Sequence, residues 1–453
     1  MFIMKQLLLI FALLYSTNAG ISLDGVAKAI KDKASSGVTN LVDGIKTDAS
    51  AIQIGANSAL DLGKETTGDI SKTLLDLKLE NLGTQKRTPV PELVKNEGYP
   101  VESYYLTTSD GYILNIFRIP YGKSGKKLNK VAYLQHGLFE SSDDWVLMGS
   151  KRGLAYILAD EGYDVWLGNC RGSYYSRNHT QWNPDKDSEF WQFSWHQIGT
   201  TDIPAMIDFI LEKTGATKLY HVGHSQGTTS FYVMASMRPE YNAKIAHHIS
   251  LAPVAYMNHL FSPLMRAMAL GTLPIGLTLE SLGKNEFLPG SGFLNMLTDS
   301  VCSEGVGQVL CKNTLFAMTG FSPKQMNVSD LPLLMAHYPA GASTKQVEHY
   351  GQLINSGRFC QYDFTILKNK EHYGQIIPPD YDLSKITAPI TLMYSSNDWL
   401  AAVVDVEKLA KQLPNLKESY RIPLVTWNHI DYILGKDAPT LVYEKVVSVL
   451  SQN

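Results

Sequence analysis

The sequence has 453 residues, of which 44% are hydrophobic and 18% are charged, and its formal net charge is −3 with the histidines neutral. A chain of this length and composition holds enough apolar side chains for one large core, so its main body is not predicted to be disordered. The slightly acidic balance, without a dense basic patch, argues against a nucleic-acid partner.

Residues 1–19 have the features of a secretory signal peptide. Lys5 precedes an apolar run at 7–15, and the small residues Thr17 and Ala19 have the spacing of a cleavage site. The apolar run is too short to span a bilayer, and no later stretch reaches about 18 uninterrupted apolar residues. We therefore expect the protein to enter the secretory pathway, with no transmembrane segment in the mature chain.

Residues 20–88 are predicted to form an N-terminal extension or propeptide. Apolar residues recur there at three-and-four spacing among mixed lysines and aspartates, which indicates amphipathic helix. Three hypotheses stay open for this extension: a helix that adsorbs to lipid surfaces, a propeptide removed after Lys86 and Arg87, and a flexible segment.

The motif Gly-His-Ser-Gln-Gly at 223–227 is the strongest indication of chemistry in the chain. It lies between a buried strand predicted at 219–222 and a helix predicted at 228–237. A serine at the tip of such a sharp strand-to-helix turn has a strained backbone, and flanking glycines are needed because a Cβ there would clash. The pattern predicts that Ser225 is a nucleophile, against the simpler interpretation of a glycine-rich turn.

A serine hydroxyl needs a base and an orienting acid. In folds that place the serine at such a turn, these partners follow it along the chain in the order acid, then histidine. A strand predicted at 389–394 leads to Asp398, and another predicted at 421–425 leads to His429. Asp405 and Asp431 are rival acids, but the first lies in a predicted helix and the second directly follows the histidine. We favour Asp398 as the acid and His429 as the base.

An oxyanion in the transition state needs two N–H donors. In folds with such a serine turn, one N–H donor belongs to the residue after the nucleophile, here Gln226, and the other to an early strand-to-helix loop. A strand predicted at 130–135 leads into His136 and Gly137, which makes Leu138 the second predicted donor. An ordinary glycine turn is the alternative interpretation of this loop.

These motifs together resemble the acid lipases, the group of lysosomal acid lipase and gastric lipase within the α/β-hydrolases. The resemblance runs from about residue 97 to the C-terminus. Carried over by position, the family triad falls on Ser225, Asp398 and His429, and its oxyanion donors fall on Leu138 and Gln226. The matched blocks lie at 110–114, 118–122, 134–138, 163–169, 223–229, 251–255 and 428–431.

The resemblance implies an α/β-hydrolase fold, with a mostly parallel central sheet and helices on both faces. We expect this core at 89–256 and 385–453, interrupted by a mainly helical cap or lid domain at 257–384. The cap is rich in leucine, methionine and phenylalanine, which suits the binding of flexible acyl chains, although most of these side chains could fill the cap's own core. The resemblance also implies a disulfide between Cys302 and Cys311.

The remaining motifs agree with a secreted chain. Cys170 and Cys360 are predicted to be buried thiols, since free cysteine is among the most buried residue types. Asn178 and Asn327 each begin an Asn-X-Ser/Thr triplet and are predicted glycosylation sites. No Cys/His cluster has zinc-ligand spacing, and we expect neither a metal nor a cofactor.

The sequence therefore predicts a serine lipase that hydrolyses neutral lipid esters through an acyl-enzyme. The resemblance implies triacylglycerol or cholesteryl ester as substrate and the lysosomal lumen or the extracellular space as location. It would act peripherally at a lipid droplet, micelle or membrane surface. Two alternatives stay open: an acyltransferase that uses the same triad, and a lipid carrier without turnover.

Overall fold

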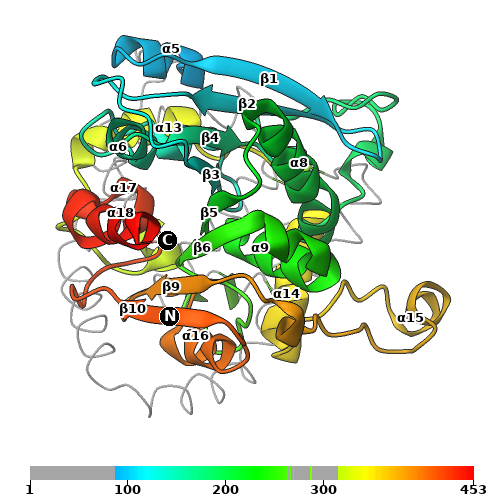
Figure 1. The fold of residues 1–453 in the computed structure, drawn as a ribbon. Coiled ribbons are helices and arrows are strands. Elements are labelled where there is room, and N and C mark those ends of the chain that lie inside the picture. The colour runs from blue at the N-terminus through cyan, green and yellow to red at the C-terminus, as the bar shows by residue number, and fades with distance from the viewer. Residues whose placement is uncertain (1–86, 264, 267–268, 270–285, 288–314, 453) are drawn as a thin grey trace, which may run out of the picture.

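The computed structural model describes residues 87–263, 265–266, 269, 286–287 and 315–452. Its centre is an eight-stranded sheet with the strand order β1-β2-β4-β3-β5-β6-β9-β10 (Figure 1). The strands are β1 (Glu102–Thr107), β2 (Ile113–Ile119), β3 (Val131–Gln135), β4 (Asp164–Gly168), β5 (Leu219–His224), β6 (Ile245–Leu251), β9 (Ile390–Tyr394) and β10 (Leu416–Arg421). A small second sheet pairs β7 (Glu286–Phe287) with β8 (Ala342–Ser343).

The middle of the large sheet is parallel. Strand β2 pairs antiparallel with β1 and β4, whereas the pairs from β4 through β3, β5, β6 and β9 to β10 are all parallel. Every residue of β3 and β5 is buried, because helices cover both faces of a parallel sheet. The carboxyl ends of these strands meet at one edge, where ligands bind in open α/β sheets.

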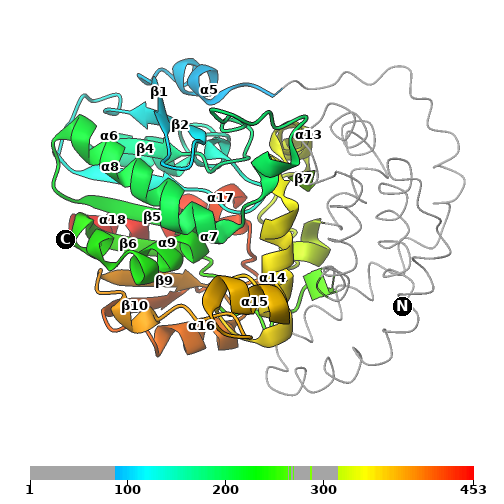
Figure 2. The same ribbon diagram turned by 90° about the vertical axis from the view of Figure 1, so that its right-hand side faces the viewer.

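Helices cover both faces of the sheet, and the sheet separates two apolar cores (Figures 1 and 2). One core contains apolar side chains of α8, α9 and α16, and the other contains those of α5, α6 and α18. The helices are α5 (Val90–Asn96), α6 (Leu154–Glu161), α7 (Trp195–Gln197), α8 (Ile203–Thr214), α9 (Gln226–Met237), α13 (Leu331–His337), α14 (Thr344–Ser356), α15 (Ile366–Tyr373), α16 (Val403–Ala410), α17 (Asp431–Leu434) and α18 (Glu444–Ser451).

Most of the predicted core elements are present, and one was wrong. The strands predicted at 130–135, 219–222 and 389–394 correspond to β3, β5 and β9, and the helix predicted at 228–237 lies within α9. The strand predicted at 421–425 is wrong, because the last strand is β10, which ends at Arg421. Its side chains alternate between half-buried and exposed, so this edge strand lacks the apolar run on which the prediction relied.

Several predictions concern residues that the structure does not describe. They include the signal peptide at 1–19, nearly all of the extension at 20–88, much of the cap, and both Cys302 and Cys311. Within the described residues, no helix has the length and apolar composition needed to cross a membrane.

A buried ion cluster joins the turn before β2 to the loop after β4 and the start of α8. The guanidinium of Arg171 lies 2.6 Å from Asp202 and 2.6 Å from Asp110, and Asp202 is fully buried. Arg171 also lies 4.0 Å from the centre of the Tyr112 ring. Burial raises the pKa of Asp202, and the adjacent Arg171 opposes that rise.

We predict that Arg171→Met lowers the free energy of unfolding by about 3–5 kcal/mol, because it leaves Asp202 as an uncompensated buried charge. Urea titration near pH 7 measures the change. Arg118→Met is the control, since its partners Glu102 and Asp164 are more exposed and such pairs contribute about 1 kcal/mol or less. Equal losses in the two variants would contradict the prediction.

Candidate active site

Ser225 occupies the turn between β5 and α9, without any linker residue on either side. Its φ of 50° and ψ of −116° lie outside the regions that non-glycine residues prefer. A Cβ on Gly223 would lie 2.8 Å from the backbone of Gly227, and a Cβ on Gly227 would overlap the carbonyl oxygen of Gln135. The close approach of β3, β5 and α9 therefore requires both glycines, as the sequence predicted.

The turn brings Ser225 next to His429, although 204 positions separate the two residues in the chain. The Nε2 atom of His429 lies 2.8 Å from the serine Oγ, and its Nδ1 lies 2.8 Å from one oxygen of Asp398 and 2.9 Å from the other. Because a carboxylate only accepts hydrogen bonds, Nδ1 carries the proton and Nε2 is free to accept the serine proton. Asp398 and His429 are both buried.

Asp398 is the carboxylate that the structure places beside His429. Its Oδ1 also accepts hydrogen bonds from the backbone N–H groups of Leu400 and Ala401, at 2.9 and 2.8 Å. The rival Asp405 pairs instead with His259 at 2.7 Å. The other rival, Asp431, accepts a hydrogen bond from the backbone of Asn428 at 2.9 Å.

One predicted oxyanion donor lies in the loop after β3, and the other directly follows Ser225 at the start of α9. Leu138 follows β3, and Gln226 is the first residue of α9, where helical N–H groups have no intrahelical acceptor. Among the described residues, neither backbone N–H donates a hydrogen bond. The Gln226 side chain is fixed by the amide of Gln346 at 3.0 Å, so α14 closes over this part of the site.

Two buried residues that the sequence analysis did not single out support this arrangement. His224 ends β5 with its Nε2 2.9 Å from the carbonyl oxygen of His429, and its Nδ1 lies 3.0 Å from Glu140. Burial lowers the pKa of His224 and raises the pKa of Glu140. In the sequence, His224 was recognisable only as the histidine inside the serine motif, and Glu140 only as a glutamate three positions after Gly137.

The remaining predicted sites are separate from this centre. Cys170 and Cys360 are buried free thiols, as predicted. Asn178 is exposed and Asn327 is half-buried, and their glycosylation stays a prediction. In the described part of the chain, no cluster of acidic, histidine and cysteine side chains could hold a metal ion.

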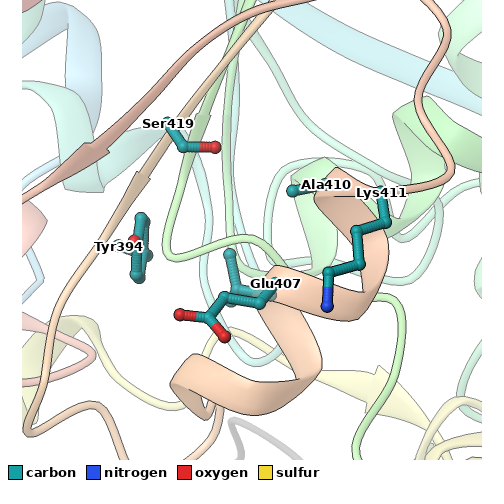
Figure 3. A pocket seen from close by; sticks show the side chains of 6 residues that line it. Tyr394, Glu407, Ala410, Lys411 and Ser419 are labelled. Carbon is teal, nitrogen blue, oxygen red and sulfur yellow. The ribbon is translucent and has the colours of Figure 1, made fainter.

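A hollow of about 270 Å³ lies elsewhere, between α16 and the strands β9 and β10 (Figure 3). Residues of these three elements line it, and none belongs to the serine centre: Tyr394, Val406, Glu407, Ala410, Lys411 and Ser419. The hollow therefore adds nothing to the chemistry of Ser225.

Comparisons with known proteins agree with this fold. Residues 90–149 match a family described as a partial alpha/beta-hydrolase lipase region, and residues 133–436 match the alpha/beta hydrolase fold. Lipase 3 of Drosophila melanogaster is 44% identical over 84% of this chain and 98% of its own length. Gastric triacylglycerol lipase of Mus musculus is 41% identical over 80% and 92%.

A third relative is the lysosomal acid lipase/cholesteryl ester hydrolase of Homo sapiens, which is 38% identical over 82% of this chain and 93% of its own. Among solved structures, that of a lipase candidate from Sulfolobus solfataricus superposes with a TM-score of 0.51 at 13% identity. It covers 78% of this chain and 94% of that chain. The structural match supports the fold alone.

We predict that Asp431 makes stability fall as the pH rises. Burial raises its pKa to about 7 from the ordinary 3.8, so folding favours the protonated acid. This contribution is complete below about pH 4 and is lost as the pH rises through 7. When the pH rises from 5 to 8, the unfolding free energy of Asp431→Asn should therefore fall by about 2 kcal/mol less than that of the parent protein. Urea titrations at both pH values test this, and parallel losses in the two proteins would contradict it.

Proposed function

Because this chain belongs to the acid lipase family of the α/β-hydrolases and is a carboxylic ester hydrolase, we propose that it cleaves triacylglycerols or cholesteryl esters. The observation that carries the proposal is the continuous hydrogen-bonded series from Ser225 through His429 to Asp398. The gastric and lysosomal relatives are named for these two substrate classes, which supports neutral lipid esters as the substrate.

In the proposed acylation step, the Ser225 hydroxyl attacks the ester carbonyl while His429 takes its proton at Nε2. Asp398 holds the histidine tautomer through Nδ1 and stabilises the imidazolium that forms. The N–H groups of Leu138 and Gln226 then bind the oxyanion of the tetrahedral intermediate, and each such donor contributes about 3 kcal/mol. When the intermediate collapses, His429 donates its proton to the departing alcohol and the acyl group stays on Ser225.

Water completes the reaction in the proposed deacylation step. His429 removes a proton from the water, which attacks the acyl carbonyl at the same oxyanion donors. The fatty acid leaves and the proton returns to Ser225.

We assign residues 257–384 to a cap over this centre and 89–256 with 385–453 to the hydrolase core. Contacts from the described part of the cap support the assignment. The carbonyl oxygen of Thr319 accepts hydrogen bonds from the backbone N–H groups of His429 and Trp399, at 3.2 and 3.3 Å. Gln346 in α14 holds the side chain of Gln226. We further propose that the protein works peripherally at a lipid surface, in the lysosomal lumen or outside the cell.

The full chain should release fatty acid from trioleoylglycerol, cholesteryl oleate or both, measured at pH about 5 and 7 on either side of the ordinary histidine pKa. Ser225→Ala should lower kcat by about 10⁴-fold or more, since it removes the nucleophile. Ser230→Ala is a matched control, because Ser230 is a buried serine in α9, the helix that follows Ser225, and its hydroxyl has no hydrogen-bond partner among the described residues.

Three results would count against the proposed function or its mechanism. Retention of activity by Ser225→Ala would remove the proposed nucleophile. An inactive parent protein that carries bound lipid would favour a carrier. Formation of a new ester in place of fatty acid, when an alcohol is added, would favour an acyltransferase.

A further inference from the structure

The carboxyl group of Glu140 contacts the loop after β3 that carries Gly137 and the predicted donor Leu138, called the oxyanion loop below. Glu140 is buried, and its Oε2 accepts a hydrogen bond from the backbone N–H of Gly137. A Cβ on Gly137 would lie 2.5 Å from the same oxygen, so the close approach depends on the glycine. Gly137 immediately precedes Leu138, and a force that holds the Gly137 backbone therefore also holds the next peptide N–H.

The same oxygen of Glu140 also reaches the loop that carries His429. It lies 3.0 Å from Nδ1 of His224, whose Nε2 lies 2.9 Å from the carbonyl oxygen of His429. A carbonyl oxygen only accepts hydrogen bonds, so the Nε2 of His224 carries a proton. One carboxyl oxygen is thus connected to both the oxyanion loop and the catalytic base, through one residue on each side.

A second carboxyl completes this buried network. The Tyr338 hydroxyl donates a hydrogen bond to Oδ1 of Asp144, and burial together with the neighbouring Glu140 raises the pKa of Asp144. Burial also raises the pKa of Glu140, so both carboxyls favour their protonated forms. Because burial favours the neutral His224 ring, whose proton is on Nε2, the protonated Glu140 carboxyl donates the hydrogen bond to Nδ1 of His224.

From this geometry we propose that Glu140 is a positioning residue for the ester hydrolysis, fixing the Leu138 N–H relative to the His429 imidazole through Gly137 and His224. This inference rests on the proposed function of Ser225, His429 and Leu138. Within the described residues, Glu140 forms no hydrogen bond with Ser225 or with the His429 ring, so it positions them through the two groups that it holds.

The physical reason is the narrow geometric tolerance of the reaction. The oxyanion donor and the base lie on loops after different strands, β3 and β10, which are not neighbours in the sheet. A displacement of about 1 Å between catalytic groups lowers rates by about 100-fold. A buried hydrogen-bonded connection between the two loops would prevent such a displacement more effectively than packing of flexible apolar side chains.

The test compares Glu140→Ala and Glu140→Gln with the parent full chain on a water-soluble short-chain ester. Active sites are counted with an organophosphate that reacts with Ser225, so that kcat refers to folded, competent sites alone. Asp143→Ala is the matched control. Asp143 is also buried and close in sequence, but its hydrogen-bond partners Arg87, Tyr175 and His337 are not residues of the serine centre.

We expect Glu140→Ala to lower kcat per titrated site by about 10- to 100-fold, with KM changed less than about threefold. Glu140→Gln keeps an oxygen for Gly137 and should recover most of that loss, while Asp143→Ala should keep kcat and lose stability alone. Parent-like kcat per titrated site in Glu140→Ala would overturn the proposal, as would an equal fall in Asp143→Ala.

If Glu140→Ala yields no titratable sites, Glu140→Gln decides. Its oxygen cannot supply the proton that His224 lacks at Nδ1, so a kcat about threefold or more below the parent is expected, and an unchanged kcat overturns the proposal. The residual rate of Ser225→Ala is subtracted from every measured rate. If Ser225→Ala abolishes nothing, the proposed function fails, and this result is distinct from a failure of the Glu140 proposal.

Discussion

The backbone turn at Ser225 sets the geometry on which the rest of the site depends. Strand β5 passes into α9 through one residue with positive φ, so the serine is lifted from the sheet while the first N–H groups of the helix stay free beside it. Such a conformation costs about 1–3 kcal/mol and persists only where the surroundings fix it. Here the surroundings are β3 and α9, which approach so closely that positions 223 and 227 must be glycine.

Polar connections, as well as apolar packing, hold the loops around this turn. The carboxyl of Glu140, the imidazole of His224 and the backbone of Thr319 each bind a loop that carries a site residue. An unpaired buried polar group is costly, so such a network favours one arrangement over its alternatives. The apolar cores on the two faces of the sheet stabilise the fold, whereas these connections select the relative placement of the loops.

The sequence predicted the elements with strong local signals. The buried strands and the serine motif were recognisable because apolar runs and paired glycines have few other interpretations. The edge strand β10 was missed because its alternation of exposed and half-buried residues resembles a polar loop. His224 and Glu140 were missed for another reason: burial of a polar side chain depends on residues more than 80 positions away, as their mutual distance of 84 positions shows.

The order of the site residues along the chain has a consequence for synthesis. Ser225 and its strained turn precede β6, whereas His429 follows β9 and β10 and lies 204 positions later in the chain. A chain that is still being translated therefore has a nucleophile without a base. The triad becomes complete only when β9 and β10 have joined the sheet, so ester hydrolysis starts only after the core has folded.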